Sequence, residues 1–188
     1  MPARAADSDR LVAVMVDTSQ ATAASMNLVR TAVATFIGGL PPVDEVLLAT
    51  TGRRMQVRVA PTTDRKKAVD SANGMTADGG PTVLMDGLLE IDSRFIRKGN
   101  RNATFVIVTG DGTESSKGEP DAFNAWLKVL STRGLVAHAV VLKSSSNGLP
   151  EVIANAVVQA TGGRLETIGN AGSLLEKLDG IAARLVHP

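Results

Sequence analysis

Apolar residues follow two different periods along this chain, one typical of buried strands and the other of amphipathic helices. The segment LVAVMV at 11–16 is apolar throughout and ends at Asp17, which predicts a strand buried on both faces. The segments at 104–109 and 135–142 repeat this pattern. Over 20–37 the apolar residues instead recur at spacings of three and four, which predicts a helix.

The rest of the chain divides in the same way. Further strands are predicted at 43–50, 55–60 and 164–168, and further helices at 64–71, 82–97, 120–133, 150–161 and 173–185. A tight turn before 55–60 makes that segment an antiparallel edge strand. Strands that alternate with helices predict an α/β fold. We expect a three-layer α/β/α, doubly wound, Rossmann-like domain with a mostly parallel six-stranded sheet and one antiparallel edge strand.

Composition narrows the classes of function. The chain has 188 residues and a formal charge of +1, which predicts one domain and excludes a strong non-specific nucleic-acid binder. It has no Cys, four Phe, one Trp and no Tyr. A catalytic thiol and a Cys-bound metal are therefore excluded, and an aromatic stacking platform is disfavoured. The apolar runs are too short and too interrupted to span a bilayer.

The first nine residues differ from the rest of the chain. They contain no apolar run, so we interpret 1–9 as a flexible N-terminal leader and 10–187 as the single domain. The segment Ala3-Arg4-Ala5-Ala6 has the pattern of small residues found around export cleavage sites. This pattern favours a periplasmic or extracellular location over a cytoplasmic one.

Acidic and hydroxyl residues collect where predicted strands end. They follow the first strand at 17–20 and the fourth at 109–116, and they precede the helix at 82–97 in the segment 78–82. In a doubly wound sheet these loops meet at the carboxyl edge of the strands. Their oxygens suit a hard cation such as Mg²⁺, Mn²⁺ or Ca²⁺. The alternative is that such residues cap helices, and Thr82 stands where an N-cap is expected.

Four motifs resemble the von Willebrand factor type A domain family, in its bacterial branch. VMVDTS at 14–19 is similar to the family's D-x-S-x-S segment, and GGPTVLMDGL at 79–88 is similar to its G-G-T-x-L stretch. IVTGDG at 107–112 is similar to the family's L-T-D-G, and ATGGR at 160–164 to a late A-T-G-G segment. The motifs occur in the family's order and span nearly the whole chain.

The resemblance implies a metal-ion-dependent adhesion site made by Asp17, Ser19, Thr82 and Asp111. The match is degenerate, because Ala21 stands where the family has its second Ser. Gly110 is also extra, so either Gly110 takes the acidic position or the loop bulges and Asp111 fills it. We expect Mg²⁺, or Mn²⁺ or Ca²⁺, with water replacing the lost hydroxyl. The alternative is a vestigial site that binds no metal.

The resemblance implies a protein-binding or adhesion module that is not an enzyme. Its partner would be an unidentified protein, recognised at the carboxyl edge of the sheet by a cation that accepts an acidic side chain. Nucleic-acid binding and membrane insertion are not expected. The first alternative is a metal-independent scaffold. A less favoured one is a haloacid-dehalogenase-like hydrolase, whose nucleophilic aspartate would fall at Thr109. Thr cannot take its place as the phosphate acceptor.

Two conspicuous side chains carry no functional prediction. His138 lies within the predicted strand 135–142 without an acidic partner nearby in sequence, so we interpret it as a hydrogen-bonded core or strand-end histidine. Trp126 occurs at helical spacing from Phe123 and Leu130, which indicates a core position.

Overall fold

The computed structural model describes residues 10–99, 102–144 and 148–186. The predicted leader at 1–9, and His187 at the predicted end of the domain, therefore lie outside the described residues. The strands are β1 (Leu11–Val16), β2 (Glu45–Thr51), β3 (Met55–Thr62), β4 (Ala103–Gly110), β5 (Val136–Leu142) and β6 (Leu165–Ile168). The α-helices are α1 (Met26–Gly39), α2 (Arg65–Asn73), α3 (Leu84–Ile91), α4 (Pro120–Leu130), α5 (Leu149–Thr161) and α6 (Leu174–Val186).

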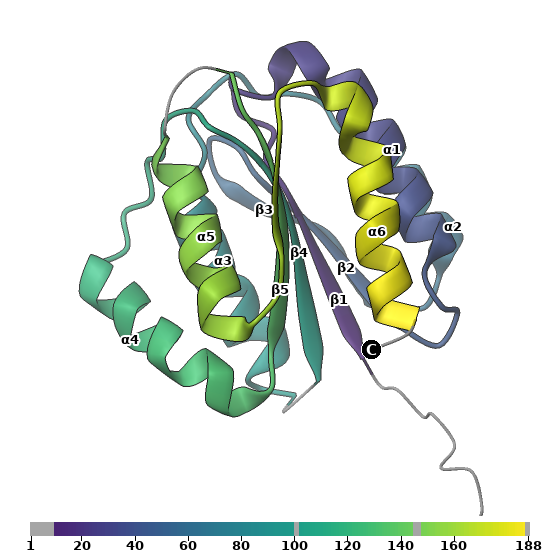
Figure 1. The fold of residues 1–188 in the computed structure, drawn as a ribbon. Coiled ribbons are helices and arrows are strands. Elements are labelled where there is room, and N and C mark those ends of the chain that lie inside the picture. The colour runs from purple at the N-terminus through teal and green to yellow at the C-terminus, as the bar shows by residue number, and fades with distance from the viewer. Residues whose placement is uncertain (1–9, 100–101, 145–147, 187–188) are drawn as a thin grey trace, which may run out of the picture.

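The six strands form one sheet in the order β3-β2-β1-β4-β5-β6. Only β2 and β3 pair antiparallel, and β3 lies at the edge, which confirms the predicted fold class. The strand order reverses between β1 and β4, which pair in parallel. A crevice for ligands is expected beyond the carboxyl ends of the strands at this reversal. We call that side of the sheet, which is at the top of Figure 1, the carboxyl edge.

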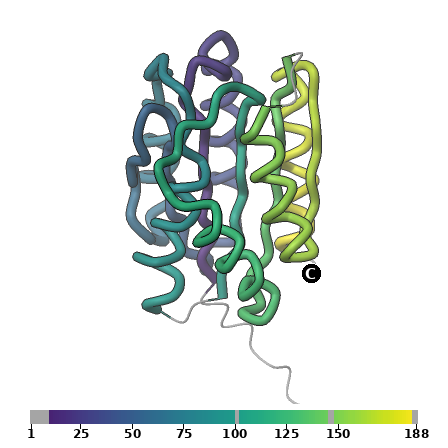
Figure 2. The backbone as a smooth tube through the Cα atoms, turned by 90° about the vertical axis from the view of Figure 1, so that its left-hand side faces the viewer, coloured from purple at the N-terminus to yellow at the C-terminus, as the bar shows by residue number. Residues whose placement is uncertain are grey.

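Helices cover both faces of the sheet. α1, α2 and α6 lie on one face, and α3, α4 and α5 lie on the other (Figures 1 and 2). Alternate residues of β1 belong to the two cores, Val12, Val14 and Val16 to the first and Leu11, Ala13 and Met15 to the second. This double burial explains why β1 is apolar at every position. None of the helices in the described ranges is long and apolar enough to cross a bilayer.

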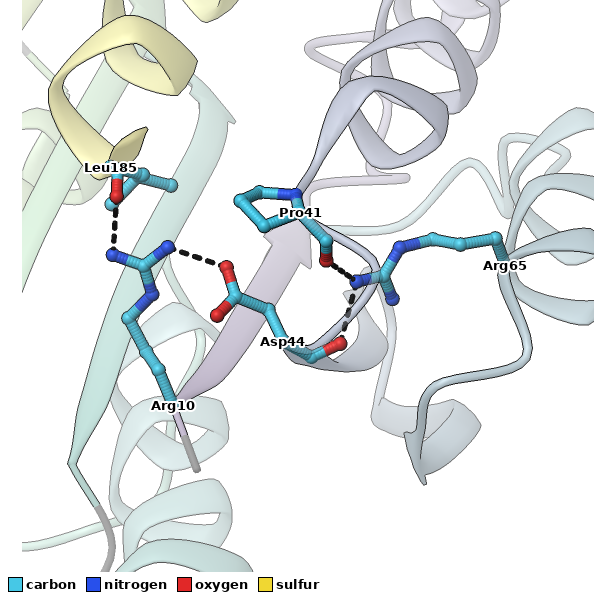
Figure 3. Close-up of polar contacts among 5 residues, drawn as sticks. All are labelled: Arg10, Pro41, Asp44, Arg65 and Leu185. Atoms are coloured by element: carbon cyan, nitrogen blue, oxygen red, sulfur yellow. Dashed lines mark hydrogen bonds and ion pairs between the residues drawn. The ribbon is translucent and has the colours of Figure 1, made fainter. Parts of the chain in front are cut away.

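A buried ion pair ties the chain together at the opposite edge of the sheet (Figure 3). The Arg10 guanidinium contacts the Asp44 carboxylate at 2.5 Å and donates to the Leu185 carbonyl at 2.6 Å. Arg65 donates to the carbonyls of Pro41 and Asp44, each at 2.5 Å. The start of β1, the α1–β2 turn, α2 and the end of α6 are thereby joined.

The predicted helix 82–97 differs from the structure at both ends. α3 begins at Leu84, its N-cap is Val83, and a π-helical segment, Asp92–Ile96, follows it. The alternative interpretation of Thr82 as an N-cap is therefore wrong. Thr82 instead forms a parallel β-bridge with Glu114, in which the Thr82 N–H donates to the Thr113 carbonyl at 2.9 Å. This bridge holds Thr82 in an extended conformation ahead of the helix.

The core position of Trp126 is confirmed. Trp126 is buried and donates its indole N–H to the carboxylate of Asp92 at 3.0 Å. His138 is buried on β5 as expected, but the expectation that it is hydrogen-bonded is wrong for its Nδ1, which has no partner among the described residues.

Burial of His138, helped by the positive charge of Arg184, lowers its pKa below the usual 6.5. The unfolded chain therefore takes up a proton at a higher pH than the folded protein does. We expect the contribution of His138 to stability to be complete above about pH 6.5 and to fall as pH drops from there toward the folded pKa. Urea unfolding of wild type and His138→Leu at about pH 8 and about pH 5 measures this. If the difference in unfolding free energy between wild type and His138→Leu were the same at both pH values, this expectation would be contradicted.

Candidate functional site

A cavity of about 460 Å³ opens at the carboxyl edge, where the strand order reverses. Its walls come from four loops that are far apart in sequence. Residues 19–21 follow β1, 79–81 precede α3, 111–113 follow β4, and Ser144 follows β5. The sequence predicted that the first three loops meet here. Convergence of the β1, β4 and α3 loops is therefore confirmed as a feature of the fold.

Asp17 is the buried anchor beneath this cavity. Its carboxylate accepts the N–H of Ser19 at 2.7 Å, the N–H of Gly110 at 3.0 Å and the hydroxyl of Thr109 at 3.3 Å. Asp17 thus joins the ends of β1 and β4. Burial raises the pKa of Asp17 above its ordinary value, although the hydrogen bonds from Gly110, Ser19 and Thr109 act in the opposite direction.

Ser19 and Thr82 have different surroundings. Ser19 lines the cavity, and its side chain hydrogen-bonds to Asp17. Thr82 is fully buried, and its hydroxyl donates to the Thr51 carbonyl at the end of β2. The structure therefore brings Asp17 and Ser19 together, whereas the Thr82 hydroxyl is bonded to the neighbouring strand.

The acidic residue after β4 bonds to a residue that follows β5. The Asp111 carboxylate accepts the N–H and the hydroxyl of Ser144, at 2.8 and 2.9 Å. Asp111 therefore fixes Ser144 just beyond the end of β5. Gly110 precedes it, and its N–H faces the Asp17 carboxylate. The motif at 107–112 left open whether Gly110 or Asp111 takes the acidic position. In the structure Gly110 lies beside Asp17, and the Asp111 carboxylate binds Ser144 after β5.

The two departures from the adhesion motif, Ala21 and Gly110, lie in contact with each other. A Cβ added to Gly110 would lie 2.7 Å from the Ala21 Cβ, and one added to Gly112 would lie 2.6 Å from it. Both distances are well inside ordinary carbon–carbon contact. Ala21 thus packs against two glycines, and a side chain at either glycine position would displace it. The sequence shows Ala21 and Gly110 as separate changes, but it does not show that they touch.

The four predicted ligands have different hydrogen-bond partners. Asp17 and Ser19 are neighbours, but Thr82 and Asp111 are bonded to Thr51 and Ser144. Ala21 also offers no oxygen side chain. Within the described ranges, no three His, Cys, Asp or Glu side chains gather closely enough to hold a metal ion. Metal binding therefore stays a prediction.

The contact with Ala21 gives a measurable coupling. Gly110→Ala is expected to lower the free energy of unfolding by about 1–3 kcal/mol, because the new methyl overlaps Ala21. Ala21→Gly removes that methyl, so the double variant should recover most of the loss. Chemical denaturation of the four proteins in a double-mutant cycle measures the coupling. Additive effects of the two substitutions would show that the residues do not contact.

The rim of the cavity carries an exposed cation on the β2–β3 turn. The Asp78 carboxylate accepts the Arg53 N–H at 2.8 Å and so fixes this turn beside the loop before α3. A Cβ added to Gly80 would lie 2.1 Å from the Arg53 Cγ, so the stem of Arg53 lies directly over Gly80. Gly80 itself lines the cavity. The place of Arg53 at this rim could not be predicted from the sequence, because it depends on a contact between segments 25 residues apart.

Comparison with known families gives one clear match. The family model described as the von Willebrand factor type A domain matches residues 12–113 of the 188. This range includes three of the four motifs. No curated protein gives a significant match.

Several solved structures share the fold at low sequence identity. A von Willebrand factor type A protein from Catenulispora acidiphila superposes with a TM-score of 0.74 at 14% identity, over 95% of this chain and 43% of that one. A conserved hypothetical protein, BatB, from Bacteroides thetaiotaomicron gives 0.72 at 12% identity, over 95% and 99% of the two chains. An aerotolerance-related membrane protein from Bacteroides fragilis gives 0.68 at 15% identity, over 93% and 98%. This chain thus spans less than half of the first of these proteins.

Proposed function

This chain belongs to the von Willebrand factor type A domain family, and we propose from that premise that it binds a partner protein at its carboxyl edge without a bridging cation. The observation that carries the proposal is the cavity of about 460 Å³ at the strand reversal, with Ala21 packed against Gly110 and Gly112 beside it. The family provides the general role in protein interaction. The packing at Ala21 favours the metal-independent form of that role.

The polarity of the cavity supports binding rather than catalysis. Its described lining contains hydroxyl groups, one carboxylate and glycine backbone, and among these residues none is His, Cys or Lys. Thr109, where a phosphate-accepting aspartate would be needed, is buried and donates to the Asp17 carboxylate. Neither a nucleophile with an adjacent base nor a phospho-acceptor is therefore formed by the described lining. We propose that the protein is not an enzyme.

The rim suits an acidic partner side chain. Arg53 is exposed, and no ion pair to its guanidinium occurs within the described residues. A guanidinium presents several N–H donors in a fork that matches a carboxylate. In this proposal the Arg53 guanidinium, instead of a metal ion, supplies the positive charge that binds an Asp or Glu side chain of the partner. Arg53→Gln should weaken partner binding, whereas Arg58→Gln on the exposed part of β3 should not.

A cation-dependent form of the same function is the second candidate. The contact between Asp17 and Ser19 favours it, since these residues begin the family's metal motif. Calorimetric titration with Mg²⁺ and Mn²⁺ at millimolar concentration separates the two forms. Saturable heat that is lost in Ser19→Ala would establish the cation-dependent form. No binding heat for either metal is what the metal-independent proposal predicts.

Quantitative affinity capture tests the site itself. Wild type, Gln20→Glu and Val129→Glu would each be used as bait in buffer that contains Mg²⁺. Gln20 is an exposed residue of the cavity wall, and Val129 is an exposed residue of α4 outside it. We expect a set of proteins to be retained by wild type and Val129→Glu and lost from Gln20→Glu, because the added carboxylate repels an acidic partner side chain. Equal retention by all three baits would contradict a binding site at the carboxyl edge.

A further inference from the structure

A second cavity lies on the side of the molecule, between α4 and α5, in the layer that contains α3 (Figure 1). Its volume is about 480 Å³, within the range of small-molecule sites. Most of its lining is apolar, and two of its wall residues, Leu149 and Val152, are 55% and 57% exposed. Side chains of this size normally bury more of their surface. The walls of this side groove are therefore apolar and open to a ligand.

One carboxylate interrupts the apolar wall. Glu114 lines the groove and accepts the N–H of Leu84 at 3.0 Å and of Ser116 at 2.9 Å. The Ser116 side chain also hydrogen-bonds to this carboxylate, so part of the acceptor capacity of its two oxygens is used and part remains. Glu114 is also held through its backbone by the β-bridge to Thr82. The wall that carries this negative charge is thus fixed before any ligand arrives.

The loop around Glu114 is fastened to the start of α3 by reciprocal hydrogen bonds. The Asp86 N–H donates to the Ser116 hydroxyl at 3.0 Å, and the Asp86 carboxylate accepts the N–H groups of Lys117 and Gly118 at 2.8 and 2.9 Å. Neither Glu114 nor Asp86 has an ion pair with another described residue. Burial, together with the charge of Asp86, raises the pKa of Glu114. The Glu114 carboxylate is therefore costly to ionise without a cation beside it, and a bound cation would stabilise its charged form.

From this arrangement we infer that the side groove is a binding site for a small organic cation, with an apolar body against Leu149 and Val152 and an ammonium group on Glu114. An amine head donates N–H bonds to the remaining acceptor positions of the carboxylate. Its charge also balances the two carboxylates that repel each other across the loop. A neutral ligand of the same shape gains the apolar contact alone, and an anion is repelled. This site is separate from the carboxyl-edge cavity and does not depend on the function proposed there.

Methyl NMR titration of the full chain tests the inference with three probes of equal length, n-hexylammonium, hexanol and hexanoate. We expect the methyl signals of Met85, Leu149 and Val152 to shift with n-hexylammonium at millimolar concentration. Hexanol should bind about tenfold more weakly, and hexanoate should give no saturable shift. Equal binding of the three probes, or no shift with the cation, would overturn the inference.

Two variants test separately how the Glu114 charge and the apolar wall contribute to binding. Glu114→Gln keeps the size of the side chain and should reduce binding of n-hexylammonium to the level of hexanol. Val152→Lys adds a bulky cation at an exposed position and should abolish binding of both probes. Val129→Lys makes the same change on α4 outside the groove and should leave both affinities unchanged. Binding that survives Val152→Lys would overturn the inference even if Glu114→Gln proved poorly folded.

Discussion

Replacing Asp44 with alanine is expected to lower the free energy of unfolding by about 3–5 kcal/mol. The Asp44 side chain is fully buried, and the Arg10 side chain is only 18% exposed. Removing the carboxylate leaves the Arg10 guanidinium in the interior without its ionic partner. A buried charge that loses its partner is far more costly than a solvated one. Urea denaturation followed by circular dichroism measures the loss.

An exposed ion pair provides the matched control for Asp44. Asp70 contacts Lys66 at 2.6 Å on the surface of α2, where the two side chains are 61% and 86% exposed. Asp70→Ala should change stability by no more than about 0.5 kcal/mol, because water solvates both charges. Similar losses for Asp44→Ala and Asp70→Ala would show that the Arg10 contact does not hold the amino ends of the strands together.

Gly163→Ala is expected to destabilise the protein by at least about 3 kcal/mol. A Cβ added to Gly163 would lie 1.8 Å from the Ala137 carbonyl oxygen. The oxygen belongs to the backbone and the Cβ position is set by the backbone, so no side-chain rotation relieves the overlap. The chain at 163 must therefore move away from β5, and the pairing of β6 with β5 begins only two residues later.

Gly169 is the control for this substitution. It follows β6, and a Cβ added there would meet no atom within 4 Å. Gly169→Ala should change the free energy of unfolding by about 0.5 kcal/mol or less. Thermal and urea unfolding of the two alanine variants would be compared under the same conditions. A stability for Gly163→Ala equal to that of Gly169→Ala would contradict the close approach of the two segments.

The architecture could be predicted because it is encoded in local patterns. Apolar runs such as 11–16 and 104–109 mark strands that are buried on both faces, and these strands indeed occupy the centre of the sheet. The polar ends of β1 and β4 were expected to converge for the same reason, since parallel strands end at one edge. The hairpin between β2 and β3 was predicted from its turn residues.

The arrangement of the site could not be predicted, because it depends on contacts between distant segments. Thr82 has the residue type and position of an N-cap, but its bridge to Glu114 holds it outside the helix. Asp111 has the residue type of a ligand, but Ser144 lies close enough to bind its carboxylate. Neither neighbour is adjacent in sequence. Motif spacing therefore predicted which loops meet at this edge of the sheet, but it did not reveal the hydrogen-bond partner of each side chain.

Affinity measurement with and without metal tests the central claim most directly, which is that the carboxyl edge binds a protein without a cation. A protein recovered by wild-type bait would be titrated calorimetrically into wild type and Gln20→Glu, in Mg²⁺ and in EDTA. We predict the same affinity in both buffers for wild type, and a loss of at least about tenfold in Gln20→Glu. Binding that disappears in EDTA, or that is unchanged in Gln20→Glu, would contradict the claim.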